Sequence, residues 1–520
     1  MKQALAIITG LIFFIIAPAE VRSQSFQLTE GGIQALVPSD GIVNNAVSNL
    51  HAEGDTLWVG PFLNTTSDGG MTWFVSDEDS LRGSRNRIFS IDVEGTTIWL
   101  GLGYIDDASG DGFQSAAGFL FSEDAGQTFQ YRPPQLDVPG DTEVQYGVST
   151  LEALDVIVPQ QSPPFDIDYD PVNDEVWVAG WASGIRRSTD AGQSWDRVVL
   201  PPDTLDFISP DSTYDFKLEP RRGTLGWLNH MGFAVLVDDL GTVWAGTPNG
   251  VNRSDDGGLS WRKSSADGSD STLTGSWVIS IEEQPLPDTN AIWMATWNAG
   301  EAGEQGVFGI TVTRDQGQSF QQVLRGERIL DFAFAEGIVY AAGDNGLFIT
   351  RDDGITWTTV RSFNDPGQPD RLIRPDARVL SVATIGNELW AGTTDGLVKS
   401  LDQGATWKLF RVEVPLHPDE PSDAVPDVDV FAYPNPFSPV ADQFVRIRYE
   451  LDTAASPRIR VFDFGMTLVR EIDIDSSSPG IRESVWDGKD SEGLRVANGT
   501  YFYVVEAAGD TFWGKILVLE

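Results

Sequence analysis

The chain has 520 residues, of which 41% are hydrophobic and 22% charged, a composition typical of a folded globular protein rather than of a disordered one. Its formal net charge is -42, so its field repels nucleic acid and anionic membrane surfaces, and neither is an expected partner. The chain has no cysteine and three histidines, which excludes disulfide scaffolds and zinc sites of the usual Cys/His types.

Residues 1–23 have the pattern of a secretory signal peptide. Lys2 gives a positive start, an apolar run extends from Ala4 to Ala17, and small residues then offer cleavage after Ala19 or Ser23. The run is shorter than the ~20 residues that span a bilayer, and an N-terminal membrane anchor is the alternative. Since no later stretch is apolar enough to span a membrane, we expect a mature chain without a transmembrane segment.

An internal repeat dominates residues 24–411. The pattern Ser/Thr-x-Asp-x-Gly-x-Ser/Thr-Trp/Phe occurs seven times, which indicates a repeat architecture. An aspartate can accept hydrogen bonds from backbone N–H groups that follow it, and glycine adopts positive φ at little cost, so each copy predicts a tight structural turn. The seven aspartates are Asp68, Asp124, Asp190, Asp256, Asp315, Asp352 and Asp402.

A second element precedes each turn, a β-rich dipeptide with Trp or Tyr that is followed by small residues. Val176-Trp177-Val178-Ala179-Gly180 is an example, and a short apolar or alternating run lies ahead of it. Each unit therefore predicts four strands: an inner strand, the Trp- or Tyr-bearing strand, a third that ends at the turn, and a fourth that begins with the aromatic residue. Seven such units predict an all-β fold, a seven-bladed β-propeller. A linear solenoid is the alternative, but it would leave two open sheet ends.

Across roughly residues 40 to 412 the chain resembles the Asp-box propellers, also called BNR-repeat proteins. The resemblance implies the fold and says little about function, because that superfamily includes sialidases, xyloglucan-degrading enzymes, sortilin-type receptors and a photosystem assembly factor. It also implies that the Asp boxes lie away from any active site. The Arg-Ile-Pro signature of the sialidases is missing, and the predicted inner strands hold almost no arginine, so sialidase activity is not expected.

Loop lengths differ between the two faces that such a ring has. The long connections run from the fourth strand of one unit to the first strand of the next, or from a second strand to a third, and both kinds emerge on the same face. Long loops on a rigid scaffold commonly bind ligands, whereas tolerated insertions without a function are the alternative. The predicted mouth comprises residues 104–117, 133–164, 201–230, 263–274, 298–305 and 364–378.

The candidate residues for metal binding or acid–base catalysis are few, or their pattern does not point to one particular site. Asp166, Asp168 and Asp170 have the spacing of the first ligands of a calcium loop, but the glycine typical of such loops is missing, and the alternative is a strand that enters an ordinary turn. Apart from Ca²⁺ there, no cofactor is expected. The histidines are separated, with His51 on a predicted inner strand, His230 at the end of a long loop, and His417 in a linker.

The amino-acid composition of the chain changes after the repeats. Between residues 412 and 428 prolines alternate with Asp and Glu, which predicts an extended linker. Residues 429–520 form an all-β segment with Tyr433-Pro434-Asn435-Pro436-Phe437 at its start and Trp486-Asp487-Gly488 later. This segment resembles the Ig-like domain of flagellar hook-cap proteins and the C-terminal sorting domains of type IX secretion cargo. The resemblance implies recognition by an outer-membrane secretion machinery; an accessory sandwich packed on the propeller is the alternative.

Two functions are compatible with this sequence. The first is a secreted or cell-surface recognition module without catalysis, which binds a glycan, a peptide or another surface partner. The second is a glycoside hydrolase or lyase that uses two carboxylates at the mouth of the channel. With 77 Asp and Glu in the chain, the sequence does not single out such a pair.

Overall fold

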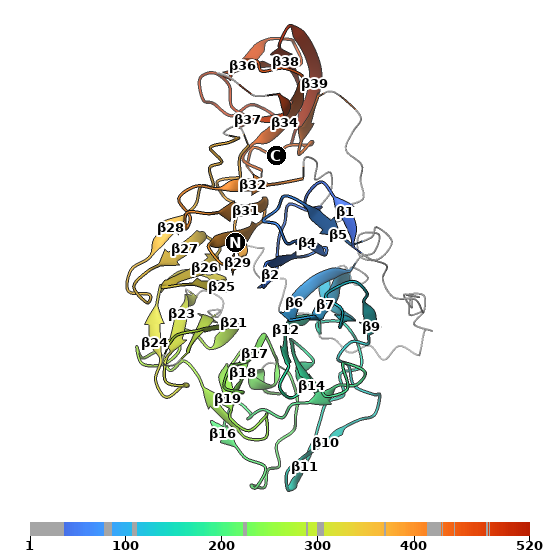
Figure 1. Ribbon diagram of the computed structural model, residues 1–520, viewed down its shortest axis with the longest axis vertical. Coiled ribbons are helices and arrows are strands. Elements are labelled where there is room, and N and C mark those ends of the chain that lie inside the picture. Colours follow the sequence, from blue (N-terminus) through green and yellow to red (C-terminus); the bar gives the residue numbers. More distant parts are fainter. Residues whose placement is uncertain are drawn as a thin grey trace.

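The computed structural model describes residues 36–76, 86–106, 112–221, 226–287, 290–298, 306–368, 371–412, 428, 430–440, 442–474, 477 and 479–519. Their regular structure is β-strand apart from one 3-10 turn, η3 (Leu228–His230). They form two parts (Figure 1), residues 37–412, which we call the ring, and residues 430–519, which we call the sandwich domain. The predicted signal peptide at residues 1–23 lies outside the described residues, as do residues 413–427 of the predicted linker. No helix in the described part is long and apolar enough to cross a membrane.

The described part of the ring contains seven antiparallel sheets that follow one another along the chain, each with a meander of four consecutive strands, and a separate two-stranded hairpin. The first three meanders are β2 (Leu50–Glu53), β3 (Thr56–Val59), β4 (Asn64–Thr66) and β5 (Trp73–Val75); β6 (Arg87–Glu94), β7 (Thr97–Asp106), β8 (Phe113–Ser122) and β9 (Gln130–Arg132); and β12 (Pro164–Asp170), β13 (Glu175–Gly180), β14 (Gly184–Ser188) and β15 (Asp196–Arg197).

The other four meanders repeat this order. They are β17 (Ala234–Val237), β18 (Val243–Thr247), β19 (Gly250–Ser254) and β20 (Trp261–Ser264); β21 (Trp277–Gln284), β22 (Ala291–Asn298), β23 (Val307–Thr313) and β24 (Gln321–Val323); β25 (Ile329–Ala335), β26 (Ile338–Gly343), β27 (Gly346–Thr350) and β28 (Thr358–Val360); and β29 (Val379–Ile385), β30 (Glu388–Thr393), β31 (Gly396–Ser400) and β32 (Lys408–Phe410). A fifth strand joins two sheets at the outer edge, β1 (Val37–Ser39) beside β5 and β16 (Phe207–Ile208) beside β20.

The first strand of each meander is its inner strand, and every inner strand contacts that of the next sheet. These contacts run from β2 through β6, β12, β17, β21 and β25 to β29, and β29 contacts β2 again (Figure 1). The sheets therefore close around a central channel instead of stacking in a line with two open ends. We call the junction between the last sheet and the first sheet the seam.

At six of the seven junctions between neighbouring sheets, the glycine of a repeated turn lies against an indole ring of the preceding sheet; at the seventh, Gly404 lies against Ile349. Gly192 has φ 75°, and a Cβ there would lie 2.8 Å from the Trp99 ring, too close for any side chain. Trp99 itself is buried, so the glycine allows the turn to cover it. The same contact joins Gly126 to Trp58, Gly258 to Trp177, Gly317 to Trp244, Gly354 to Trp293 and, across the seam, Gly70 to Trp390.

The repeated turns share one set of hydrogen bonds. In the fourth sheet Asp256 Oδ1 accepts from the Ser260 backbone N (2.8 Å) and from Ser254 Oγ (2.8 Å), Asp256 Oδ2 accepts from Ser260 Oγ (2.5 Å), and the Gly258 N donates to Ser254 Oγ (2.8 Å). The side chain thus satisfies backbone groups that the tight turn leaves without strand partners. The same bonds surround Asp68, Asp124, Asp190, Asp315, Asp352 and Asp402.

Two of the long segments predicted to surround the mouth lie largely elsewhere. Residues 133–164 contain the hairpin of β10 (Glu143–Tyr146) and β11 (Ser149–Glu152), and residues 201–230 contain β16. Tyr146 and Leu151 of the hairpin share an apolar core with Ile208 and Leu218 of the second segment. Figure 1 shows β10, β11 and β16 at the outer edge of the ring. This part of the prediction is corrected, because apolar side chains in the two segments bury one another away from the channel.

The sandwich domain has two sheets with a shared core. The order of the first is β33 (Val430–Tyr433), β34 (Val445–Leu451), β37 (Gly480–Trp486); the order of the second is β36 (Leu468–Asp473), β35 (Arg458–Phe462), β38 (Gly499–Ala507), β39 (Asp510–Val518). Ile447, Trp486, Val461 and Tyr503 from the two sheets pack together, and Phe437 of the proline-rich opening is buried with them. Alternation of apolar and polar residues along these strands explains the two-layer packing.

Replacement of Asp256 by alanine should destabilise the ring. The variant loses the acceptor for Ser254, Ser260 and the turn backbone, and loss of a comparable cap in helices costs about 1–2 kcal/mol. Urea unfolding measures the change. The neighbouring Asp255 is 60% exposed and forms a surface ion pair with Arg253, so Asp255→Ala is the matched control and should change stability little. Equal effects of the two substitutions would contradict the role assigned to Asp256.

Candidate functional site

The inner strands present unpaired backbone groups to the channel, since each has a sheet partner on one side only. Carboxylates of the preceding inner strand accept hydrogen bonds from these groups. Asp92 accepts from the N of Tyr169 (2.7 Å), and Asp331 accepts from the N of Val382 (2.9 Å). Other polar side chains bind the carbonyl groups, namely Asn49 at Phe89 O (2.7 Å), Ser90 at Pro164 O (3.0 Å), His51 at Val93 O (3.2 Å) and Thr384 at Phe334 O (2.6 Å). Polar groups of the channel wall therefore connect neighbouring sheets.

The predicted calcium ligands belong in part to this wall. Asp166 and Asp168 accept hydrogen bonds from the backbone N of Val235 (3.0 Å) and Val237 (3.2 Å) on the next inner strand. Asp170 is turned away and closes the turn between β12 and β13, where its Oδ1 accepts from the N of Val172 (2.8 Å). Calcium at this place stays a prediction, and within the described ranges no group of three or more His, Asp or Glu is arranged to hold a metal ion.

A cavity of about 390 Å³ occupies the channel, and carboxylates form part of its lining. Burial raises the pKa of Asp166 and of Asp331 to about 7. Burial, together with the nearby charge of Asp331, raises the pKa of Glu282 well above its usual range. Burial lowers the pKa of His51, so this histidine is neutral at pH 7 and does not compensate the carboxylates. No donor to Glu282 is found among the described residues, which distinguishes it from its neighbours in the wall.

An arc of aromatic side chains lies where several inner strands begin. Phe89 and Phe165 stand near the start of β6 and β12, and Phe233 directly precedes β17, with ring centroids 6.4 and 6.3 Å apart in succession. Trp181 and Trp277 continue the arc, with centroids 5.0 and 5.6 Å from that of Phe233. All five side chains are partly exposed. We call these residues the aromatic arc.

Local backbone irregularity places two rings of the aromatic arc at the channel. The pairing of β6 with β7 shifts between Ile88 and Ser90, and that of β12 with β13 shifts between Pro164 and Asp166. Each bulge leaves one residue without a cross-strand partner, and a bulge re-aims the side chain that it carries. These extra residues are Phe89 and Phe165, and both line the cavity.

The aromatic arc was not among the site residues expected from the sequence. An alignment of the repeats on their inner strands contains the signal, because Phe89, Phe165 and Phe233 occupy corresponding places in three successive units. The position of a bulge, however, depends on pairing with the neighbouring strand. A single unit therefore gives no indication that these rings face the channel.

The structure places the other predicted site residues in different parts of the molecule. His51 lies on the inner strand β2 as expected. His230 is buried, accepts from the N of Glu219 at Nδ1 (3.1 Å) and donates from Nε2 to Leu200 O (3.1 Å); burial lowers its pKa to about 3, so its role is structural. Residues 364–378 contact the sandwich domain through Leu372. His417 and the predicted mouth residues 107–111, 222–225, 299–305 and 369–370 lie outside the described residues.

The sandwich domain has relatives among known protein families. Residues 439–510 match the family model of the FlgD Ig-like domain, and these residues fall within the two-sheet part described above. The C-terminal end is thus an Ig-like domain. A search of curated proteins finds no match to the chain.

Several solved structures are similar to the chain. PorZ, a bacterial surface component of the type-IX secretion system of Porphyromonas gingivalis, is 14% identical, with 91% of this chain and 75% of that chain covered and a TM-score of 0.37. The GH74 enzyme of Niastella koreensis is 12% identical, with 94% and 74% covered and a TM-score of 0.42. FlgD from P. aeruginosa is 22% identical, with 17% and 67% covered and a TM-score of 0.15.

The channel carboxylates predict a pH-dependent stability. Their pKa values are raised in the folded state, so the stabilisation that they contribute is fully present below the unfolded pKa near 4 and is lost as pH rises through about 7. Urea unfolding should show a less stable protein at pH 8 than at pH 5.5. Asp331→Asn removes one such carboxylate and keeps an oxygen for the N–H of Val382, so the loss should shrink by about 2 kcal/mol.

The control for this experiment is Asp206→Asn, since Asp206 is 89% exposed and its substitution should leave the pH dependence unchanged. If Asp331→Asn follows the wild-type profile throughout this pH range, the channel carboxylates do not cause the effect.

Proposed function

We propose that this protein is a secreted or cell-surface recognition module, in which a seven-bladed β-propeller of the Asp-box type binds a ligand at one mouth of its channel without catalysis. The observation that carries the proposal is the aromatic arc. Five partly exposed aromatic side chains gather at one end of the channel, where they offer a large apolar surface with specific ring geometry. Such a surface suits the apolar face of a sugar ring or the side chains of a peptide.

The closed series of seven meanders supports the propeller, and the repeated turn supports the Asp-box assignment. Each turn carries its Ser or Thr, its Asp and its Gly in one hydrogen-bonded arrangement, as shown for Asp256. These aspartates lie at turns between third and fourth strands, whereas the inner strands line the channel. The Asp boxes are therefore proposed as structural elements of the scaffold and not as part of the binding site.

The hydrogen bonds that the channel carboxylates form with the backbone favour ligand recognition over glycoside hydrolysis. A glycosidase needs two carboxyl groups that are available to the substrate, about 5 Å apart for retention or about 6.5–9.5 Å for inversion. Asp92, Asp166 and Asp331 instead accept hydrogen bonds from backbone groups of neighbouring sheets. Only Glu282 in the cavity combines a raised pKa with the absence of a donor among the described residues. It supports the alternative, a glycoside hydrolase or lyase in which Glu282 is the proton donor.

Glycan and peptide arrays probed with the full chain test the proposal. A captured ligand should bind the wild-type protein, and Trp181→Ala or Trp277→Ala should weaken its binding at least about tenfold, because each removes a large stacking surface. Trp513→Ala is the matched control, since Trp513 is a 57% exposed tryptophan of the sandwich domain and its loss should not matter. Wild-type affinity in both arc variants would contradict the proposed binding face.

The same polysaccharides should be incubated with the protein and assayed for new reducing ends or unsaturated products. Recognition predicts no product from any of them. Product formation that is lost in Glu282→Gln would replace recognition with the hydrolase or lyase alternative.

We further propose that the sandwich domain acts as a sorting domain, read by an outer-membrane secretion machinery, and that residues 1–23 direct the first membrane crossing. In a bacterium with a type IX secretion system, the full chain should become accessible to an external protease or antibody. A chain that ends at residue 412 should stay inside the outer membrane, with circular dichroism of the retained material as a check that it is folded. Surface exposure of the shortened chain would contradict the sorting role.

A further inference from the structure

The seam differs from the other junctions of the ring because no connecting segment of chain joins the two sheets that meet there. The sheet orders β1-β5-β4-β3-β2 and β29-β30-β31-β32 share no strand either. The seam is therefore held by noncovalent contacts between the two sheets. Trp390 and Phe410 pack against Trp73, and the N of Val47 donates to Thr393 O (2.9 Å).

The residues that end the ring cross the seam. Asn45, which precedes β2, pairs with the backbone of Val412 as a strand would: its Nδ2 donates to Val412 O (3.1 Å), and its Oδ1 accepts from Val412 N (2.7 Å). A second contact joins Lys399 Nζ to Gly69 O (2.7 Å). Val412 thus supplies two of the hydrogen bonds that hold the last sheet to the first.

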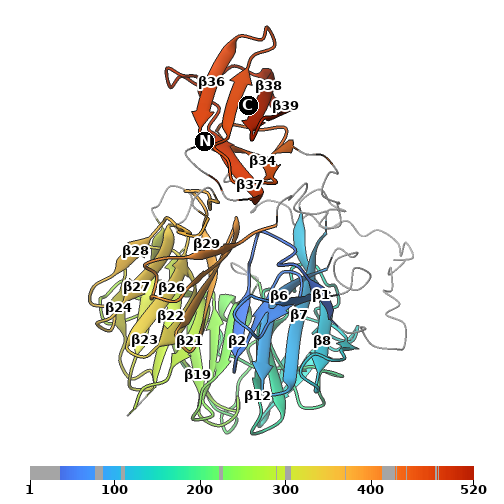
Figure 2. The ribbon, with the colours of Figure 1, turned by 45° about the horizontal axis from the view of Figure 1, so that its top comes forward.

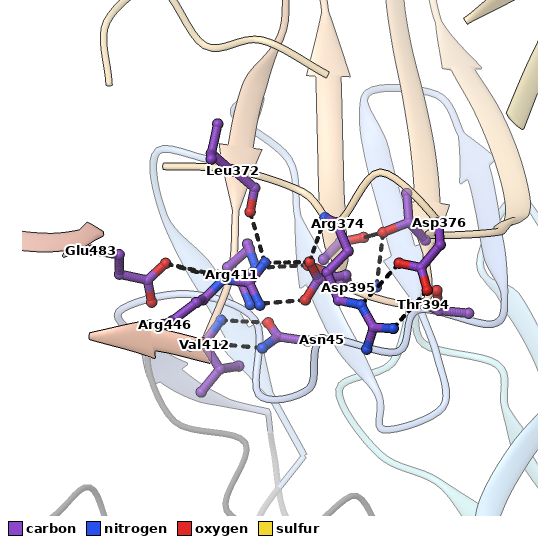
Figure 3. A network of polar contacts seen from close by, with 12 residues as sticks. Asn45, Leu372, Arg374, Asp376, Thr394, Asp395, Arg411, Val412, Arg446 and Glu483 are labelled. Carbon is purple, nitrogen blue, oxygen red and sulfur yellow. Dashed lines mark hydrogen bonds and ion pairs between the residues drawn. The ribbon is translucent and has the colours of Figure 1, made fainter. Parts of the chain in front are cut away.

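Arg411, the residue before Val412, is bound by the ring and by the sandwich domain together (Figure 3). Its Nε donates to Asp395 O (2.7 Å) and its Nη2 to Asp395 Oδ1 (2.9 Å), within the last sheet. Its Nη1 donates to Oε2 of Glu483 (2.9 Å), on β37 of the sandwich domain. The guanidinium group therefore spans the boundary between the two parts of the molecule.

Arg446 of the sandwich domain binds the opposite side of the same carboxylate. Its Nη2 lies 2.5 Å from Asp395 Oδ2 and 3.0 Å from Leu372 O, and its Nε lies 3.6 Å from Glu483 Oε2 (Figure 3). Asp395 also accepts from the N of Arg374 (2.8 Å). One carboxylate in the turn between β30 and β31 is thus shared by both arginines.

The four charged side chains of this network are only 1 to 8% exposed. Two arginines face two carboxylates, so the buried charges balance, and the planar guanidinium groups satisfy several oxygens at once. Removal of one partner would leave a buried charge uncompensated, which is strongly unfavourable. The network therefore resists any motion that separates the sandwich domain from Arg411 and Asp395.

We propose that the sandwich domain has a further function within the folded protein: it clasps the seam of the ring, because Glu483 and Arg446 hold Arg411 and Asp395 in the position that keeps Val412 paired with Asn45. This function goes beyond recognition and export and depends on neither. Figure 2 shows the sandwich domain beside the ring on the side of β29 and β1, which belong to the two sheets that form the seam. The clasp predicts that the domain remains attached to the ring when the linker is cut.

Hydrogen exchange measured by mass spectrometry on the full chain tests the clasp at the seam. In Glu483→Gln, amides of β2, β3 and β29–β32 should exchange about tenfold faster or more, because Arg411 loses a buried partner, while β12–β15 on the far side of the ring should keep their rates. Asp473→Asn is the matched control, since Asp473 forms an exposed ion pair with Arg458 in the same domain, and it should change none of these rates. Acceleration that is equal all around the ring, or none at the seam, would overturn the proposal.

A second measurement uses a chain that folds with all its charges in place. A protease recognition sequence replaces part of the predicted linker at residues 413–427, and the purified protein is cut and passed over a size-exclusion column. We expect the two fragments to elute together with the seam still protected from exchange, and to separate after cutting in the Glu483→Gln background. Separation of the wild-type fragments without faster exchange at the seam would overturn the clasp. Because neither readout involves a ligand or a secretion system, failure here leaves recognition and export to their own tests.

Discussion

The contact between a turn glycine and the indole ring of the preceding sheet is the interaction on which the ring depends. The aspartate shapes the turn, positive φ at the glycine lets the backbone approach, and the missing Cβ leaves room for the ring of a tryptophan such as Trp99 or Trp177. Each repeat thus covers aromatic side chains of the preceding sheet, and its own aromatic side chains are covered by the next repeat. A series of units with this property is complete only when the first sheet covers the last, as Gly70 of the first sheet does with Trp390 of the last across the seam.

Because the ring of sheets closes, one unpaired strand edge from every sheet borders the narrow central channel. Carboxylates such as Asp92 and Asp331 satisfy the free N–H groups, but their gathering in a region removed from bulk water raises their pKa values. The acids that at first suggest catalysis are therefore largely part of the scaffold. The aromatic arc lies beside these carboxylates, and its Phe89 and Phe165 line the same cavity as Asp166 and Asp331.

The sandwich domain combines two relations to the ring. Residues 439–510 match the FlgD Ig-like domain and carry the proposed export role, whereas the contacts of the domain make it part of the closed structure through Arg411 and Asp395. The two are compatible, since the charges at the interface come from one face of the domain, on β34 and β37. A buried network of balanced charges fixes orientation as well as contact, because each guanidinium group fits its carboxylate in few geometries.

The sequence by itself determined the all-β class, the repeating four-strand unit, the tight turns at the seven aspartates and the division before residue 430, because turn chemistry and strand alternation are local properties of the chain. Only the tertiary structure decided which side chains meet. The outer packing of residues 133–164 on residues 201–230, the bulges that aim Phe89 and Phe165 at the channel, and the shared carboxylate of Asp395 all join residues far apart in the chain. Their partners are set by pairing register and by burial, which no single segment encodes.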